Sequence, residues 1–300
     1  MDNKFNFSSK FSVANIFSLI LFVTSVLFIL FKGLNYGIDF KGGTLIELRA
    51  SSTGASEIRT ALNKMDLGDV NVKNFGQEGD YLIKVEQKEN EGNKIIPQIK
   101  ENLSENLKTE INFRRVEIVG PKVSSELLQS GIIAISLSLA AMLFYIWIRF
   151  EWQFSIGSII ALFHDVVITL GIFSILSLEI NLSIIAAVLT IVGYSMNDTV
   201  VIYDRIRENL NKYNRLNISE IADLSINDTL ARTIITSVTN LLALLSIFIL
   251  GGEILKGFSF AMILGVVVGT YSSIFVASPM LKFFKVTYKT LEREEEKIVP

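Results

Sequence analysis

The sequence predicts a polytopic α-helical membrane protein with six transmembrane helices and a small ferredoxin-like α+β domain between the first two. Half of the 300 residues are hydrophobic and only 19% are charged, whereas about 25% of residues are charged in a typical soluble domain. The hydrophobic residues fall into six long blocks. One long polar segment, residues 32–127, separates the first block from the second.

The residue types present exclude several kinds of chemistry. The chain has no cysteine and only one histidine, His164, so disulfides, thiolate metal sites and multi-histidine metal sites are excluded. We therefore expect no metal and no cofactor. The net charge of −2 provides no basic surface for phosphate contacts, which argues against nucleic acid as a partner.

The six hydrophobic blocks are long enough to cross a membrane. A transmembrane helix needs about 20 mostly apolar residues to span about 30 Å of hydrocarbon. The first block follows Lys4 and Lys10 as a signal peptide would, but its apolar run is too long and no small-residue cleavage site precedes Lys32. We therefore expect an uncleaved anchor. The blocks are residues 13–31, 131–148, 155–178, 182–202, 231–250 and 257–281.

Basic residues predict the orientation of the helices. Lys and Arg near the hydrophobic blocks concentrate in the two tails, at Arg149 and in the 203–233 loop, and Lys256 is left on the other side. The positive-inside rule then places both termini and this loop in the cytoplasm and the domain at 32–127 in the periplasm. The expected parts are a tail at 1–12, the first helix at 13–31, the domain at 32–127, helices two to six at 128–284 and a tail at 285–300.

The polar segment reads as a ferredoxin-like unit. We expect a strand at 38–48 with a bulge or turn at Gly42-Gly43, a helix carrying Ile58 and Leu62, short strands at 70–75 and 81–85, a helix at 95–107 and a strand at 113–119. The order is β-α-β-β-α-β. No acid, base or metal constellation is present in it, so we interpret it as a docking module.

Two acidic residues, Asp165 and Asp198, fall well inside apolar blocks, and His164 adjoins the first of them. An ionisable side chain at such depth is costly unless it faces a partner or water, so each is a functional hypothesis. Asp198 lies in a stretch too polar for a lipid-facing helix. That stretch contains the further supporting candidates Tyr194, Asn197 and Thr199.

Arg232 opens the fifth block on the side where Asp198 lies, and it is the basic residue at a helix mouth best placed to reach Asp198 if helices four and five are antiparallel neighbours. We interpret Asp198 and Arg232 as a proton-conducting pair. Two alternatives stay open: Arg232 could anchor the helix in the headgroups, and Asp198 could form a static interhelical hydrogen bond.

His164 and Asp165 also suggest a hydrolytic dyad. Neighbouring residues of a helix point about 100° apart, however, and no H-E-x-x-H or G-x-S-x-G element accompanies them. We therefore do not expect an enzyme. Asp165 shares a helix face with Ser158 and Thr169, which favours a hydrated seam between helices, and a packing role for His164 remains an alternative.

Two further patterns concern packing and the cytoplasmic side. Gly265 and Gly269 belong to a four-residue repeat of small residues, which lets another helix approach closely. Residues 218–230 predict an amphipathic helix lying on the cytoplasmic face. Residues 292–297 predict a solvated tail.

Several short motifs occur in order along the chain. They are residues 37–44 (GIDFKGGT), 120–123 (GPKV), 164–165 (HD), 193–199 (GYSMNDT), 204–209 (DRIREN) and 232–233 (RT). Together they resemble the SecF family, from about residue 10 to residue 285. The family's members are the smaller partners of SecD in the bacterial Sec protein-export machinery and belong to the RND superfamily of proton-driven membrane proteins.

This resemblance implies a multi-pass inner-membrane subunit that, with SecD, uses the proton motive force to promote export of preproteins after SecA and SecYEG. It implies a heterodimer with SecD, with YajC and YidC as additional candidate partners. Asp198 would be the proton-carrying carboxylate, Arg232 its basic companion, and His164 and Asp165 a signature element. Tyr203 stands where a smaller or different residue is expected.

Two other functions are considered. Half of an RND-type proton-driven exporter of small hydrophobic molecules is the alternative within the superfamily, although the exported domain is too small to enclose a drug-sized tunnel. An intramembrane hydrolase would need a nucleophile aligned with His164. For the translocation subunit, we expect movement at Asp198 to reach the exported domain through helices one and two.

Overall fold

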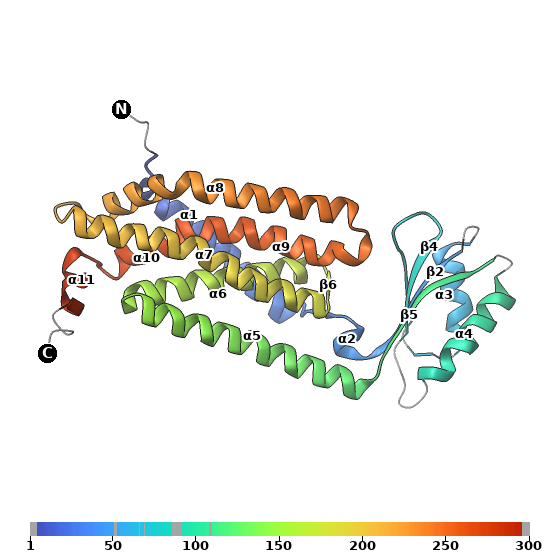
Figure 1. Cartoon of the computed structure of the whole chain (residues 1–300). Coiled ribbons are helices and arrows are strands. Elements are labelled where there is room, and N and C mark those ends of the chain that lie inside the picture. Colours follow the sequence, from blue (N-terminus) through green and yellow to red (C-terminus); the bar gives the residue numbers. More distant parts are fainter. Residues whose placement is uncertain are drawn as a thin grey trace.

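The computed structural model describes residues 5–50, 53–65, 67–68, 70–85, 92–107 and 110–295. It consists of a long helix bundle with the α+β domain at one end (Figure 1). The C-terminal helix α11 (Tyr288–Glu295) lies at the end of the bundle away from that domain. Lys4 and residues 296–297 of the expected tail lie outside the described residues.

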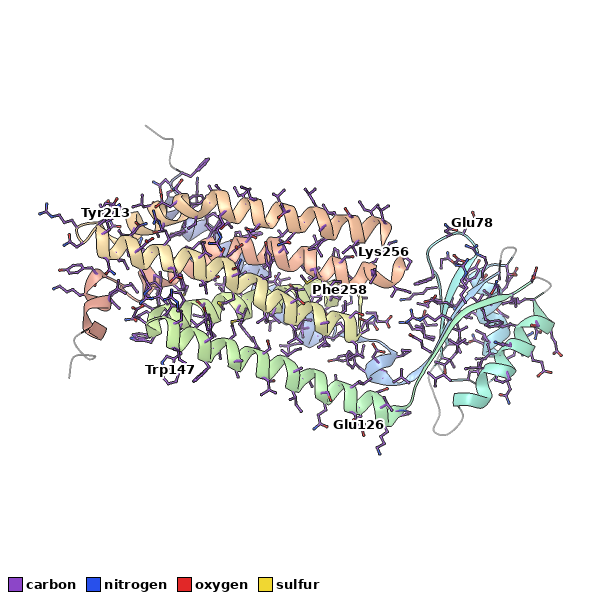
Figure 2. The ribbon with its side chains drawn as sticks, in the orientation of Figure 1. Glu78, Glu126, Trp147, Tyr213, Lys256 and Phe258 are labelled. Carbon is purple, nitrogen blue, oxygen red and sulfur yellow. The ribbon has the colours of Figure 1, made fainter. Side chains whose placement is uncertain are left out.

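Six helices of the described chain are long and apolar enough to cross a membrane, which confirms the expected fold class. Helices α6, α7 and α9 are central, whereas α1, α5 and α8 are largely exposed along their apolar stretches. Exposed aromatic side chains such as Trp147 stand on the outer surface of the bundle (Figure 2), as expected for residues that face lipid or its interface. The helices are α1 (Phe11–Phe31), α5 (Pro121–Arg149), α6 (Trp152–Ile175), α7 (Leu182–Lys212), α8 (Ile218–Leu250) and α9 (Glu253–Ser272).

Helix α9 does not end the last span by itself. It continues through a π-helical turn (Ser273–Ala277) into α10 (Ser278–Phe283). A π-helical turn shifts the backbone hydrogen-bond register and leaves carbonyls free for other partners.

Residues 218–230 are helical as expected, but they do not form a helix that lies on the membrane face. These residues form the first part of α8, which runs without interruption from Ile218 to Leu250. The Asn217 side chain accepts hydrogen bonds from the backbone of Ser219 and Glu220, and Glu220 caps Asn217 in return, which fixes the helix start. No glycine or proline follows within the helix to break it.

The α+β domain has the expected β-α-β-β-α-β order. Its antiparallel sheet has the strand order β3-β4-β2-β5, and side chains such as Ile46, Ile58 and Ile83 form a core between the sheet and its helices. Alternate residues of the same strands, such as Lys84, face away from this core toward the bundle. The elements are β2 (Gly43–Arg49), α3 (Ala55–Asn63), β3 (Val70–Asn74), β4 (Asp80–Val85), α4 (Gly92–Asn106) and β5 (Asn112–Val119).

The first strand of the domain begins later than the sequence predicts. Residues Ile38–Lys41 form the short helix α2 instead of extended chain. The reason is the glycine pair that follows: Gly42 and Gly43 have φ values of +80° and +140°, a backbone region that favours glycine, and they turn the chain out of α2 into β2. A Cβ on Gly43 would also lie 2.7 Å from the Val85 carbonyl oxygen.

A second, two-stranded sheet joins the domain linker to the bundle. Strand β1 (Asn35–Tyr36) pairs in parallel with β6 (Glu179–Ile180), which lies in the connection between α6 and α7. Two-residue strands have no periodicity that a sequence reveals, and the sequence did not predict this pair.

Candidate functional site

Asp198 is buried near the middle of α7. The residue is only 3% exposed. Its Oδ2 atom has no hydrogen-bond partner within the described chain. Thr270 of α9 lies within hydrogen-bonding reach of the carboxyl group. A buried carboxyl with one unsatisfied oxygen is costly as an anion. Binding of a proton to Asp198 would remove that cost.

Arg232 lies on α8, which packs against α7 as expected for neighbouring helices. Arg232 acts electrostatically on Asp198, but no ion pair joins the two side chains among the residues described. The arginine is exposed at the surface of the chain. The structure therefore brings the two helices together and leaves the arginine free to face another molecule as well as Asp198.

A chain of hydroxyl groups leads across the bundle toward Asp198. The Tyr194 hydroxyl donates to Ser237 Oγ at 3.1 Å, and Ser237 Oγ and Thr270 Oγ1 are 2.8 Å apart. These groups come from α7, α8 and α9. The chain places exchangeable protons beside the carboxyl group.

The two remaining candidates of the polar stretch have different surroundings. Thr199 is buried, and its hydroxyl donates to the Ser195 carbonyl oxygen at 3.2 Å, a bond within the helix. Asn197 is exposed on the opposite side of α7. Neither belongs to the hydroxyl chain.

Asp165 joins three helices through its carboxylate. Ser195 of α7 donates to Oδ2 at 2.6 Å and Ser272 of α9 donates to the same atom at 2.7 Å. His164 Nδ1 lies 2.9 Å from Oδ1. The sequence indicated the polar face of Asp165 but not these serines, because hydroxyls are common on membrane helices and only the fold brings them to the carboxylate.

His164 is enclosed between α6 and α1. Its ring is parallel to the Phe22 ring, with an interplanar angle of 5° and centroids 6.5 Å apart. Its Nε2 atom is buried and has no partner in the described structure, and its one hydrogen bond there is to Asp165. No serine or threonine hydroxyl of the described chain is therefore hydrogen-bonded to His164 as an aligned nucleophile would be.

The two candidate packing glycines bring α9 against α7. A Cβ on Gly265 would lie 2.2 Å from Ile191 Cγ1, and a Cβ on Gly269 would lie 3.0 Å from Ser195 Cβ. The close approach also positions Ser272, one turn further on, to reach Asp165. Gly265 and Gly269 thus allow the close helix packing that brings Ser272 to Asp165.

Tyr203, the departure from the motif, is accommodated by a glycine on α6. Its hydroxyl donates to the Ala277 carbonyl oxygen at 2.8 Å, in the π-helical turn. A Cβ on Gly157 would lie 2.5 Å from the Tyr203 oxygen. The tyrosine therefore fills a space that Gly157 leaves.

The described residues contain no group of three or more His, Asp or Glu side chains that could hold a metal ion. The site offers carboxyl, hydroxyl, imidazole and guanidinium groups only. Carboxyl, hydroxyl and imidazole groups can hold and pass protons, and a guanidinium group supplies a permanent positive charge.

Family models match most of the chain. The model described as "Protein export membrane protein SecD/SecF, C-terminal" matches residues 99–287, and the SecD/SecF GG motif matches residues 27–53. The chain belongs to the SecD/SecF family. It is accordingly a multi-pass membrane protein of protein transport, which favours protein export over the small-molecule exporter.

Curated relatives in this family are similar over nearly their full length. The chain is 46% identical over 294 residues to protein translocase subunit SecF of Rickettsia rickettsii (strain Sheila Smith), covering 96% of each chain. It is 47% identical over 282 residues to the subunit of the same name of Rickettsia bellii (strain OSU 85-389), covering 93% of each.

Solved SecDF structures share the fold. The crystal structure of SecDF, a translocon-associated membrane protein from Thermus thermophilus, has a TM-score of 0.84 and 36% identity, covering 95% of this chain and 39% of that one. A second, in the super-membrane-facing form, has a TM-score of 0.71 and 34% identity, covering 99% of this chain and 40% of that one. The chain thus spans about two-fifths of the solved SecDF chains.

Proposed function

We propose that this chain, together with SecD, uses the proton motive force to promote export of preproteins across the inner membrane. The observation that carries the proposal is the enclosed Asp198 carboxyl, with one oxygen unpartnered in the described structure. Both termini would be cytoplasmic and the α+β domain periplasmic. SecYEG, SecA and the translocating preprotein would be functional partners, with YajC and YidC as additional candidates.

Proton uptake would act through the charge of Asp198. The Asp198 anion attracts Arg232. A proton that binds the carboxyl group removes this attraction and also removes the cost of burying the anion. Helices α7, α8 and α9, which meet at this carboxyl, would then repack. One elementary charge crossing 100 mV releases about 2.3 kcal/mol, which shifts a two-state equilibrium by roughly fifty-fold.

Arg232 and Asn197 are both exposed on the surface of this chain. Polar groups at the surface of membrane helices are costly in lipid, so a helix of a partner chain would cover them. The similarity to SecDF chains more than twice as long as this one supports SecD as that partner. The proton site would be completed at the contact between the two subunits.

The test replaces the two charges. Asp198→Asn and Arg232→Met should leave the complex with SecD assembled and should remove the stimulation of export by a proton gradient, because neither variant can alternate between paired and unpaired charge. Export into inverted membrane vesicles, measured with and without the gradient, gives the result, and copurification reports assembly.

Thr60→Ala is a control for this test. Thr60 is exposed on α3 of the α+β domain, away from the helices that carry Asp198 and Arg232, and its hydroxyl donates to the Ser56 carbonyl oxygen of its own helix. The control should keep full stimulation. Stimulation retained in Asp198→Asn or in Arg232→Met would exclude the proposed proton site.

A further inference from the structure

The connection between α6 and α7, residues 176–181, is held by the segment that enters the α+β domain. Beyond the β1–β6 pairing, the Gly37 amide donates to the Ile180 carbonyl oxygen at 2.8 Å. The Leu182 amide, at the start of α7, donates to Asp39 Oδ2 at 2.9 Å. The end of α6 is held too, since Ser174 Oγ donates to the Gly33 carbonyl oxygen at 2.7 Å.

Gly37 lies against the Glu179 side chain where the two segments meet. A Cβ on Gly37 would lie 2.5 Å from Glu179 Oε1, so a side chain here would displace the end of the flexible Glu179 side chain. This glycine belongs to the GG-motif region of the sequence. The α6–α7 connection and residues 35–41 therefore fit together as one unit, which we call the clasp.

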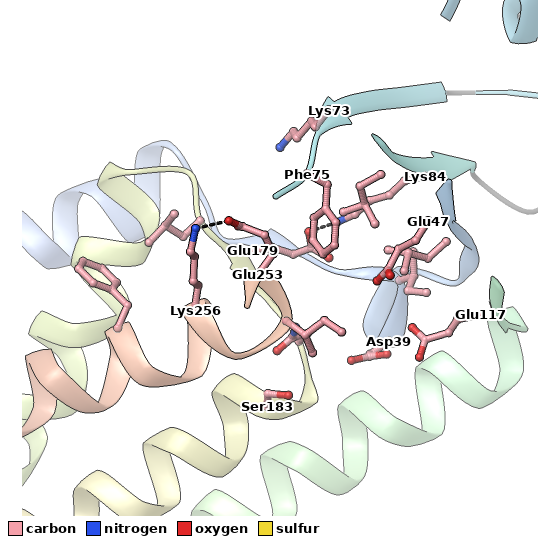
Figure 3. A pocket seen from close by; sticks show the side chains of 18 of the residues that line it. Asp39, Glu47, Lys73, Phe75, Lys84, Glu117, Glu179, Ser183, Glu253 and Lys256 are labelled. Carbon is pink, nitrogen blue, oxygen red and sulfur yellow. Dashed lines mark hydrogen bonds and ion pairs between the residues drawn. The ribbon is translucent and has the colours of Figure 1, made fainter. Parts of the chain in front are cut away.

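An ion pair extends the clasp to the sheet. Lys84 of β4 pairs with Glu179 of β6, and both side chains are largely buried (Figure 3). Burial, with Lys73 and Lys41 nearby and Asp39 opposing them, lowers the pKa of Lys84 to about 8. The ammonium group thus stays charged at neutral pH and can hold Glu179.

The pair borders a cavity of about 630 Å³ between the sheet and the ends of the helices. Its sheet side carries charged side chains such as Glu47 and Lys84 (Figure 3). Its lining on the bundle side includes the apolar side chains of Phe173 and Phe260. The sheet is therefore not packed tightly onto the bundle there. The domain has space to move relative to the helix ends, and the Lys84–Glu179 pair crosses that space.

The helices that the clasp joins are the ones that carry the buried acids. Asp165 lies on α6 and Asp198 on α7, and in the described structure both the connection between these helices and their adjoining ends contact the segment that enters the domain. Helices α1 and α5 continue directly into the domain, but their apolar spans, residues 13–31 and 131–148, contain no acidic, basic or histidine side chain. A displacement of α6 or α7 therefore reaches the domain first through the clasp.

We propose that the clasp transmits displacement of α6 and α7 to the α+β domain, and that Glu179, held by Lys84, is the positioning residue that makes this transmission effective. This inference rests on the proposed proton-driven function. The sequence led us to expect that movement reaches the domain through helices one and two. The proposed route runs instead through the α6–α7 connection, which is remote in sequence from the domain.

Charge reversal tests the ion pair. Glu179→Lys should lower the stimulation of export by a proton gradient about fivefold, the factor that corresponds to ~1 kcal/mol for a paired charge. The exchanged pair, Lys84→Glu with Glu179→Lys, should restore stimulation, since the attraction is rebuilt with opposite polarity. Full stimulation in Glu179→Lys alone would overturn the inference.

Glu253→Lys is the matched control. Glu253 lines the same cavity, but its ion pair is with Lys256 of its own helix α9 and does not touch the clasp. This variant should keep full stimulation. A loss equal to that of Glu179→Lys would mean that the charge of the cavity matters and not the clasp, and would also overturn the inference.

A covalent replacement keeps the test informative if charge reversal disturbs folding. The chain has no cysteine, so Lys84→Cys with Glu179→Cys introduces a single pair. Export stimulation should fall in this variant and should return after bridging with a short bismaleimide. Failure of the bridge to restore stimulation in the assembled complex would overturn the inference.

Carbodiimide labelling of Asp198 separates this inference from the proposed function. Labelling requires a protonated carboxyl, so it should depend on pH equally in the original chain and in Glu179→Lys if the clasp acts after the proton site. Labelling that is independent of pH in the original chain would refute the proton site itself. Labelling altered by Glu179→Lys would overturn transmission by the clasp.

Discussion

Asp165 has no solvent exposure and accepts hydrogen bonds from two serine hydroxyls, with His164 at its second oxygen. Three helices thereby share one carboxylate. A buried acceptor with several donors fixes the helices at one distance from each other, because each donor loses its partner if a helix moves away.

Asp165→Ala should destabilise the bundle by about 3 kcal/mol, since it leaves buried donors on α6, α7 and α9 without an acceptor. Ser272→Ala removes only one of those donors and should cost less. Thermal unfolding in detergent, followed by circular dichroism, measures both. Equal stability of Asp165→Ala and the original chain would contradict the shared role of this carboxylate.

Asp80 gives the α+β domain a pH dependence. Its carboxylate binds Arg49 through two hydrogen bonds, at 2.7 and 2.9 Å, and Arg114 through one at 3.0 Å. The Arg49 hydrogen bonds, and then the charge of Arg114, hold the pKa of Asp80 below its ordinary value of 3.8. The stabilisation is thus complete above 3.8 and is lost as the pH falls through the lower folded-state pKa.

The domain should therefore become easier to unfold as the pH is lowered below 3.8. Urea unfolding followed by digestion with a protease that is active in acid measures this dependence. Asp80→Asn lacks this ionisable group, so the stability of the variant domain against urea should change less with pH. An identical slope in the variant would show that other carboxyl groups cause it.

At the scale of elements, the glycines of α9 decide how closely it approaches α7. Gly265→Ala should destabilise the protein by about 1–3 kcal/mol, the usual cost of overpacking, because the added carbon would lie 2.2 Å from Ile191 Cγ1. Gly257→Ala is the control, since its added carbon would meet Ile184 Cδ1 at an ordinary 3.4 Å. Thermal unfolding of both variants in detergent is the measurement.

Pairing Gly265→Ala with Ile191→Ala tests the cause of that loss. Removing the isoleucine branches makes room for the new methyl group, so the two changes should cost less together than their sum. Additive costs would show that Gly265 does not act through its contact with α7.

The elements with strong periodicity were predictable, and those fixed by tertiary contacts were not. Apolar blocks and the spacing of Ile58 and Leu62 are local patterns and gave the six helices and the α+β unit. The turn at Gly42-Gly43 was visible, but whether the residues before it form a strand or a helix depended on packing. The two-residue strands β1 and β6 have no pattern at all.

The candidate site was predictable in its ionisable residues and not in their partners. Asp198, Asp165 and His164 stand out because charge is rare in apolar blocks. Ser195, Ser237, Thr270 and Ser272 do not, because membrane helices contain many hydroxyls and only the crossing of α7, α8 and α9 selects these. The clasp likewise joins residues about 140 positions apart, a separation that local patterns do not encode.

At the scale of the whole molecule, the domain and the bundle are connected at one end by three routes: the chain entering from α1, the chain leaving into α5, and the clasp. The last is made of hydrogen bonds and one ion pair. These contacts tie the ends of α6 and α7 to the segment that enters the domain, so the clasp is the route that starts from the helices carrying Asp165 and Asp198.

The unbroken course of α8 has a mechanical consequence. Its 33 residues form a rod of about 50 Å (Figure 1), and Arg232 lies just before the middle of this helix. Near the Ile218 end of α8, the side chains of Asp223 and Asn227 accept hydrogen bonds from the backbone amides of Ser8 and Phe5, respectively. If α8 tilted about Arg232, its Leu250 end, beside the α+β domain, would move further than its Ile218 end. The N-terminal residues bound to the Ile218 end would move in the opposite direction.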